Sequence, residues 1–271
     1  DIIADALANP VDGAVVVPYV ETNAEFGTVV DGSIIDVRGN LGETPTPEND
    51  LTVDSAALTN SVVLGVTGKI TVSDSLLGND YIDGGSGIEI DNSVIVDTDI
   101  VNMNADIVLK DNISIISTDE DKPFVMTTKG TAEITDYDEY TGGSIILEGA
   151  DLQNGVIKSG VTAERNADGT YTYTPTTSAT DAMVDDGTGS LTPLGTKLPY
   201  GQIKVTDSAL NKMDISTVAG AISVTDSSVA ASAISTGSGD VTLAGTNATA
   251  PGATDGSYLP PPPNNGKAGA T

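Results

Sequence analysis

A repeat of 19 residues restricts the fold of this chain more than any other feature of its sequence. Three successive segments begin at Gly201, Gly220 and Gly239, and each aligns with the next at an offset of 19 residues. The tetrapeptide VTDS occurs at the same place in the first two segments. The aligned apolar columns are Ile203, Ile222 and Val241; Val205, Val224 and Leu243; and Ile215 and Ile234. A unit this short cannot bury its own apolar residues, so we expect the units to stack.

The same spacing occurs in the first half of the chain. Two apolar columns run through it at spacings of 19, 18 and 19 residues. They are Leu51, Ile70, Ile88 and Ile107, and Val53, Val72, Ile90 and Leu109. Between the two arrays, the stretch GSIILEGADLQNGVIK, from Gly143 to Lys158, is predicted to form a further unit whose phase is interrupted by insertions.

Within each unit, apolar residues alternate with polar ones, which is typical of short β-strands with one buried face. Glycines and Asp-Ser pairs between the strands are turn residues, so each unit can form one coil stacked about 4.8 Å above the last. Left-handed hexapeptide helices would need an aliphatic residue at every sixth position, which the columns do not show. We therefore predict an all-β fold, a right-handed parallel β-helix (solenoid) with an inserted hairpin and long loops. A β-sandwich of short strands is the alternative.

With these segments identified, the sequence resembles the β-helical stalks of secreted bacterial adhesins, of the filamentous-haemagglutinin and autotransporter-passenger type. The resemblance covers roughly residues 51–115 and 201–249 and rests on GQIKVTDSAL, GAISVTDSSV and GKITVSDSLL. It is one of period and composition. It implies surface attachment, matrix building or partner binding, and it carries over no catalytic residue.

The pattern divides the chain into five regions. These are an N-terminal β segment or cap (1–50), a β-solenoid (51–159), an inserted hairpin and loop (160–200), further solenoid coils (201–249) and a Pro/Gly-rich tail (250–271).

The composition excludes several kinds of chemistry. The 271 residues include no Cys, His or Trp, so Ser-His-Asp and Cys-His nucleophile systems and zinc fingers are excluded. Asp and Glu number 39 against 11 Lys and Arg, a formal net charge of -28, which disfavours nucleic acid and acidic membranes as partners. No apolar run approaches the roughly 20 residues of a membrane span. With its start at Asp1, we expect a processed or excised protein, located outside a prokaryotic cell or on its surface.

Calcium is the only cofactor that the sequence raises. The stretch GNDYIDGGSG, Gly78 to Gly87, resembles one calcium β-roll nonapeptide, which makes Asp80 and Asp83 candidate ligands. The motif occurs once and then runs into the 19-residue register, so a glycine-rich corner is the favoured interpretation. Asp207 and Asp226 are one coil apart and could bind cations between coils. Carboxylates capped by turn amides are the favoured alternative, and we expect Ca²⁺ to add stability without being required for folding.

A hairpin is predicted from Gly160 to Pro175 about the turn Asn166–Gly169, with Tyr171 and Tyr173 on one face. The two tyrosines could contact a glycan or protein partner, or they could pack on the rod.

The tail is a candidate for assembly contacts, because a Pro-rich strap needs something to hold it. Its candidate residues are Tyr258, Leu259, Pro260, Pro261, Pro262 and Pro263. We expect the N-terminal strands to cap or augment a neighbour's sheet, which gives a homo-oligomer or polymer.

These observations favour a non-enzymatic extracellular structural or adhesive protein that self-assembles into a filament, matrix or surface layer. Alternatives are a polysaccharide-active β-helix enzyme, a glycan-binding module and a spacer domain in a secreted or phage complex. Two carboxylates suffice for glycoside hydrolysis, but the two arginines, Arg38 and Arg165, are isolated in sequence, and an acidic glycan would meet an anionic wall.

Overall fold

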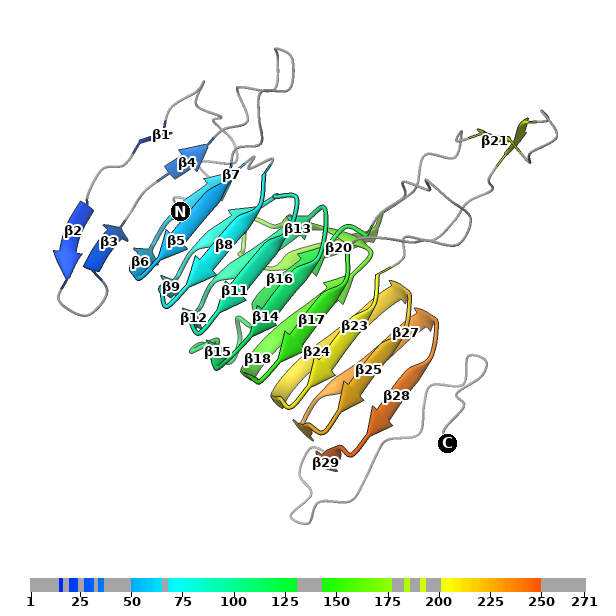
Figure 1. Cartoon of the computed structure of the whole chain (residues 1–271). Helices are drawn as coiled ribbons and strands as arrows, with labels where there is room; N and C mark the ends of the chain where they lie inside the picture. The colour runs from blue at the N-terminus through cyan, green and yellow to red at the C-terminus, as the bar shows by residue number, and fades with distance from the viewer. Residues whose placement is uncertain are drawn as a thin grey trace.

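The computed structural model describes residues 15–16, 20–23, 27–31, 34–36, 50–64, 68–130, 143–176, 183–185, 191–193 and 201–249. These residues form strands, turns and connecting segments, and the strands stack into a rod (Figure 1). The long sheets of the rod are parallel, which confirms the predicted β-solenoid and not the β-sandwich. None of the described residues belongs to a helix with the length and apolarity that a membrane span requires.

Sheet one forms one side of the rod and contains eight parallel strands. Its strands are β5 (Leu51–Asp54), β8 (Ile70–Ser73), β11 (Ile88–Asp91), β14 (Ile107–Lys110), β17 (Ile145–Glu148), β23 (Ile203–Thr206), β25 (Ile222–Thr225) and β28 (Val241–Ala244). β17 pairs with β14 on one side and with β23 on the other. The two arrays of the sequence are therefore joined into one solenoid, through the predicted intermediate coil.

Sheet two follows sheet one in the coils from β5 onward. Its parallel strands are β3 (Gly27–Asp31), β6 (Ala56–Thr59), β9 (Leu76–Gly78), β12 (Val94–Val96), β15 (Ile113–Ile116), the first parts of β18 (Ala150–Ser159) and β24 (Ala209–Ala219), β26 (Ser228–Ala230) and β29 (Asn247–Thr249). Register is kept from coil to coil, as in the pairing of Leu152 with Leu210 and of Leu210 with Val229.

Sheet three completes each coil. Its strands are β4 (Ile34–Asp36), β7 (Val62–Leu64), β10 (Tyr81–Asp83), β13 (Asp99–Met103), β16 (Phe124–Thr128), the second parts of β18 and β24, and β27 (Ala233–Ser238). Because β18 and β24 run through both sheets without a break, sheets two and three are continuous in the middle of the rod.

The core is the set of inward columns of the three sheets. The columns predicted from the repeat lie in it: Ile70, Val72, Ile107, Leu109, Ile203, Val205, Ile222 and Val224 are each at most 1% exposed. Ile203 pairs with Ile222, and Ile222 pairs with Val241, in the predicted register. Each coil thus buries its neighbour's apolar face.

The backbone conformation at the corners explains why Asp, Asn and Gly recur between the strands of the repeat. Between sheets one and two, each coil has a residue with a positive φ, and the coil of β14 has a second one, Asn112. Most of these residues are Asp, Asn or Gly, which tolerate the left-handed region best. The column is Ser55, Asp74, Asn92, Asp111, Gly149, Asp207, Asp226 and Gly245. Between sheets two and three a second such column contains Asn60, Asn79, Asp97, Asn154, Lys212 and Ala231.

The third corner requires glycine for steric reasons. A Cβ atom at Gly220 would lie 2.3 Å from the carbonyl oxygen of Gly201, and one at Gly239 would lie 2.3 Å from that of Gly220. The glycines that begin the three repeat segments therefore let successive coils approach closely.

Antiparallel strands occur at three other places among the described residues. At the N-terminal end, β2 (Val20–Asn23) pairs with β3, and β1 (Val15–Val16) pairs with β4. The predicted hairpin is formed by β19 (Val161–Arg165) and β20 (Tyr171–Pro175). A further pair, β21 (Met183–Asp185) and β22 (Leu191–Pro193), lies in the long insertion.

Candidate functional sites

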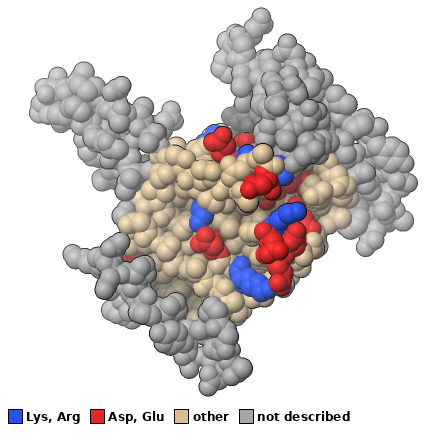
Figure 2. All heavy atoms as spheres, turned by 180° about the vertical axis from the view of Figure 1, so that it is seen from behind, with Lys and Arg blue, Asp and Glu red and all other residues tan. Residues whose placement is uncertain are grey.

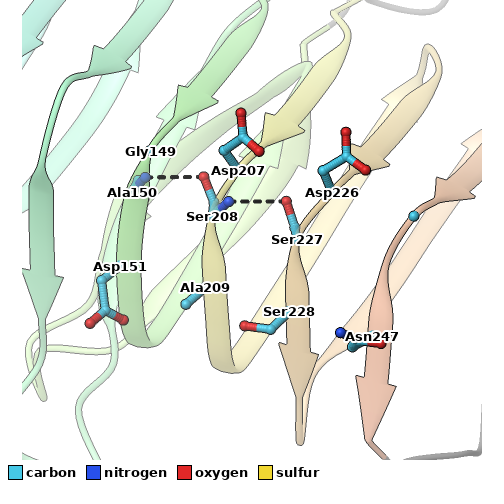
Figure 3. Close-up of a pocket in the computed structure, with 11 residues that line it drawn as sticks. Gly149, Ala150, Asp151, Asp207, Ser208, Ala209, Asp226, Ser227, Ser228 and Asn247 are labelled. Atoms are coloured by element: carbon cyan, nitrogen blue, oxygen red, sulfur yellow. Dashed lines mark hydrogen bonds between the residues drawn. The ribbon is translucent and has the colours of Figure 1, made fainter.

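The first candidate site is the corner that carries Asp207 and Asp226. Both residues have φ near 50°, and in Figure 3 their carboxylates project side by side in the same direction. The corner lines an open groove together with Asp151, Gly245 and Asn247. No cluster of three or more acidic side chains suited to a metal ion occurs in the part of the chain that the structure describes.

The corner amides are capped by serine hydroxyls, one residue after each aspartate. The Ser208 amide donates to Oγ of Ser227 at 3.1 Å, and the Ala150 amide donates to Oγ of Ser208 at 3.1 Å (Figure 3). Each hydroxyl in turn donates to a carbonyl two residues earlier, as Ser227 does to Thr225 at 2.7 Å. The sequence interpretation assigned the capping to the aspartates. The structure gives that task to the serines, and the aspartates supply the left-handed backbone.

The second candidate pair, Asp80 and Asp83, flanks a strand. Asp80 is 2% exposed; its Oδ1 accepts from the Ser61 amide at 2.8 Å and its Oδ2 from the Gly78 amide at 2.9 Å. It thus does at this corner what a serine hydroxyl does at others. Asp83, at the other end of β10, accepts from the Tyr81 hydroxyl at 3.1 Å. The two carboxylates have different partners, and GNDYIDGGSG forms a corner, a strand and a glycine turn.

The hairpin covers the outer face of sheet three. Apolar outward side chains of β7, β10, β13 and β16 form a second cluster with the hairpin, made of Val62, Leu64, Tyr81, Val101, Val125 and Ala163, with Val156, Tyr171 and Tyr173 packed against it. The rings of Tyr171 and Tyr173 stack with centroids 6.3 Å apart, and Lys158 Nζ lies 5.2 Å from the centre of the Tyr173 ring. Tyr171 and Tyr173 thus pack on the rod while staying partly exposed, and their contact with a glycan or protein partner stays a prediction.

Two sets of hydrogen bonds hold the hairpin on the sheet. The Asn102 amide group donates to the Ala163 carbonyl at 3.0 Å and accepts from the Ala163 N–H at 2.8 Å. The Tyr171 hydroxyl donates to Oδ2 of Asp99 at 2.5 Å, and the Val125 amide donates to Oδ1 of Asp99 at 2.8 Å. The hairpin is therefore fixed at both of its strands.

Electrostatics under the hairpin favour neutral groups. Burial raises the pKa of the Asp99 carboxyl, while the hydrogen bonds from Tyr171 and Val125 and the nearby Arg165 act against the rise. Burial, with the adjacent carboxylates, raises the pKa of Tyr81 and of Tyr171 well above the usual range for tyrosine. Both phenols therefore remain protonated near neutral pH and act as hydrogen-bond donors, not as bases.

The open surface carries paired charges. Figure 2 shows one face of the molecule, on which basic side chains lie beside acidic ones among uncharged residues. On sheet one, hydrogen bonds from Lys110 and then Lys69 lower the pKa of Glu89 to about 2. Lys158 Nζ lies 2.8 Å from Asp214, and Lys212 Nζ lies 2.6 Å from Glu120. These contacts neutralise four of the basic groups locally, and the 39 acidic residues of the chain far outnumber its 11 basic ones.

Asp99 and Asn102 were not singled out from the sequence. Asn102 contacts a residue 61 positions later, and a single sequence contains nothing that links the two. One signal was present, since SVVLG lacks the alternation of its neighbours, and a continuous apolar run indicates a strand buried on both faces. The assembly candidates Tyr258–Pro263 lie outside the described residues.

Comparison with known proteins gives no relative for this chain: no family model, no curated protein and no solved structure matches it.

Proposed function

We propose that this protein is a non-enzymatic structural or adhesive component of a prokaryotic cell exterior, which self-associates into a filament, matrix or layer. The observation that carries the proposal is the uninterrupted stack of eight strands in sheet one, with a single core along its length. A rod of this kind resists bending and presents equivalent positions at regular intervals, as a spacer or matrix element must. The resemblance to adhesin stalks points the same way.

The buried polar groups also support this proposal over an enzyme. Asp99 is held by Tyr171 and Val125 beneath the hairpin, and Asp80 is held by two backbone amides. These carboxylates are engaged in holding the fold, whereas glycoside hydrolysis needs two carboxyl groups facing a substrate.

Assembly is tested by electron microscopy and light scattering of the full chain and of a variant lacking residues 252–271. We expect polymers of the full chain, and a truncated protein with an unchanged melting temperature that no longer polymerises. A full-length protein that stays monomeric at high concentration, with divalent cations present, would contradict the proposal. Turnover of acidic or neutral glycans, with or without calcium, would favour the enzyme alternative instead.

Calcium enters the proposal as a stabiliser. Asp207 and Asp226 stand side by side at an open corner, whereas the core is apolar and the hydroxyls of Ser208 and Ser227 bond to protein groups. We expect millimolar Ca²⁺ to raise the melting temperature slightly and a chelator to leave the protein folded. Complete unfolding in chelator would restore the β-roll interpretation.

A further inference from the structure

The C-terminal end of the rod presents an open layer of core. β27, β28 and β29 are the last strands of their sheets, and each pairs on one side only within the described residues. The inward side chains of Val241, Leu243 and Ala248 are partly exposed. Their equivalents one coil earlier are buried: Ile222 and Val224 are 0% exposed and Val229 is 7% exposed. This end therefore exposes both apolar side chains and the hydrogen-bonding edges of three strands.

Within residues 233–249, the edge carries none of the usual protection against pairing. Natural sheets guard an exposed edge with lysine, proline, a bulge or a covering segment. Residues 233–249 contain no proline and no basic residue, and Asp240 is their only charged residue. The tail that follows, residues 250–271, has five prolines, which cannot donate ladder hydrogen bonds, so its sequence does not favour an edge strand. An unguarded edge of this kind favours a partner strand.

The N-terminal end is closed in a different way. There the outermost parallel strands of sheets two and three, β3 and β4, are each covered by an antiparallel strand, β2 and β1 (Figure 1). These strands stand where a second rod would have to continue the parallel stack. A head-to-tail arrangement is therefore blocked on two of the three sheets. Among the rod ends that the structure describes, the one with the edges of all three sheets open to meet a C-terminal end is another C-terminal end.

We propose that two copies of the chain join through their C-terminal ends about a two-fold axis, with β28 of one copy antiparallel to β28 of the other. A two-fold axis perpendicular to the rod places an edge strand antiparallel to its own copy, and such self-complementary contacts are the commonest in homo-oligomers. Antiparallel pairing is also how this chain closes its other end. Each copy brings only Asp240 to the strand edges, so little charge repulsion opposes the contact.

The inference rests on the proposed self-association and specifies its first contact. It joins two rods into one rod of twice the length, and growth into a filament or layer then requires a second contact elsewhere on the molecule.

The test compares Leu243→Lys with Thr242→Lys in the full chain by size-exclusion chromatography with light scattering, at concentrations too low for polymers to form. Leu243 points inward at the open end, and the adjacent Thr242 points outward and is exposed, so the two variants add the same charge on opposite sides of one strand. At these concentrations we expect dimers of the wild type and of Thr242→Lys, and monomers of Leu243→Lys with an unchanged circular dichroism spectrum. If Leu243→Lys loses its fold, Val241→Lys replaces it.

Single cysteines distinguish the geometry, because the chain has none of its own. Under the two-fold arrangement, Thr242→Cys cross-links to itself with a short bis-maleimide, whereas Thr52→Cys, on the exposed face of β5, does not. Cross-linking only when the two variants are mixed would overturn the two-fold arrangement in favour of head-to-tail stacking. Polymers that persist with Leu243→Lys would overturn this contact but not the proposed function, and a wild type that is always monomeric would overturn both.

Discussion

The coils before the hairpin and the coils after it share one register, but they differ in what covers sheet three. In the first set, the outward side chains of Val62, Leu64 and Val101 are 0–1% exposed, as deeply buried as the inward ones. In the second set, the outward residues Ala233 and Ser235 of β27 are exposed. The first set is therefore buried on both faces of this sheet and the second on one, so the hairpin gives half of the rod a second small core.

This difference explains why the repeat is clearest near the C-terminus. A strand buried on one face alternates apolar and polar residues, as ISVT of β25 does, and alternation makes the columns visible. A strand buried on both faces has no such constraint, as VVL of β7 shows. The period is a property of the stacking, and the pattern within it depends on what lies outside.

The largest expected effect tests whether the two sets share one core. Ile222→Asp and Ile70→Asp each place an unpaired carboxylate at a site that is 0% exposed. We expect each to lower the free energy of unfolding by about 3–5 kcal/mol, or to prevent folding. Chemical denaturation measures the change, and the outward neighbours Ser223→Asp and Thr71→Asp are the controls, expected within about 0.5 kcal/mol of wild type. A small loss at either inward site would contradict a continuous solenoid.

The second prediction weakens the contact between the hairpin and sheet three. Asn102→Gly introduces a residue that tolerates the positive φ of 59° at this position, but it deletes both hydrogen bonds between the Asn102 side chain and Ala163. We expect the docking of the hairpin to weaken by about 1–3 kcal/mol, because the Ala163 amide loses its buried partner. Hydrogen exchange of β19 and β20 is the measurement.

Asn79→Gly is the matched control for this variant. Asn79 has a similar φ of 56°, and its side chain bonds to Asn60, not to the hairpin. Exchange in β19 and β20 that rises equally in both variants would mean that Asn102 does not hold the hairpin.

The third prediction concerns the pH dependence of stability, which has opposite signs for Asp99 under the hairpin and for Glu89 on the open surface. Asp99 has a raised pKa in the folded protein, so its contribution to stability is present below its unfolded pKa and lost as the pH rises through the folded one. Glu89, with a folded pKa of about 2, contributes above its ordinary pKa of 4.5 and loses that contribution as the pH falls towards 2. Its ion pairs are partly exposed, so we expect less than about 1 kcal/mol from it.

Denaturation across pH separates the two groups. Relative to wild type, Asp99→Asn should be neutral or stabilising at pH 7, because the amide can still accept from Val125 and donate to the Tyr171 oxygen. It should lose any advantage in acid, where the Asp99 carboxyl is also neutral. Glu89→Gln should be slightly destabilising at pH 7 and equal to wild type near pH 2. Identical pH dependence in the two variants would contradict the difference between the surfaces.

The smallest expected effect is a change in stability when backbone strain at one corner is relieved. Ala231 has φ 49° in a column that otherwise contains mainly Asn and Asp. Ala231→Gly relieves this strain and should stabilise the protein by about 0.5–1 kcal/mol. Ala230→Gly, in strand β26, should instead destabilise it by a similar amount. A shift of the melting temperature in the same direction for both would show that the corner conformation is not under strain.

The fold could be predicted from the sequence because stacking repeats its demands in every coil. The inward positions Ile203 and Ile222, and the glycine corner at Gly220, recur at one spacing. The hairpin was also predictable as a hairpin, since its turn and alternation are local. Packing of its tyrosines on the rod was one of two alternatives, but the contacts that dock it were not predictable, because Asn102 and Ala163, or Asp99 and Tyr171, meet once only. The corner aspartates were recognised, but their neighbours' role was missed, because capping by Ser208 and Ser227 depends on which coil each hydroxyl faces.

The most direct test of the central claim is a cross-link at the joint between the two arrays, where the repeat alone gives no register. The structure pairs Ile146 with Lys204 across adjacent outward positions of β17 and β23. In this cysteine-free chain, Ile146→Cys/Lys204→Cys should form a disulfide in the monomer under mild oxidation, because parallel neighbours lie within disulfide reach. The off-register pair Ile146→Cys/Thr206→Cys should not form one. Equal cross-linking of both pairs, or preference for the second, would contradict a single continuous solenoid in this register.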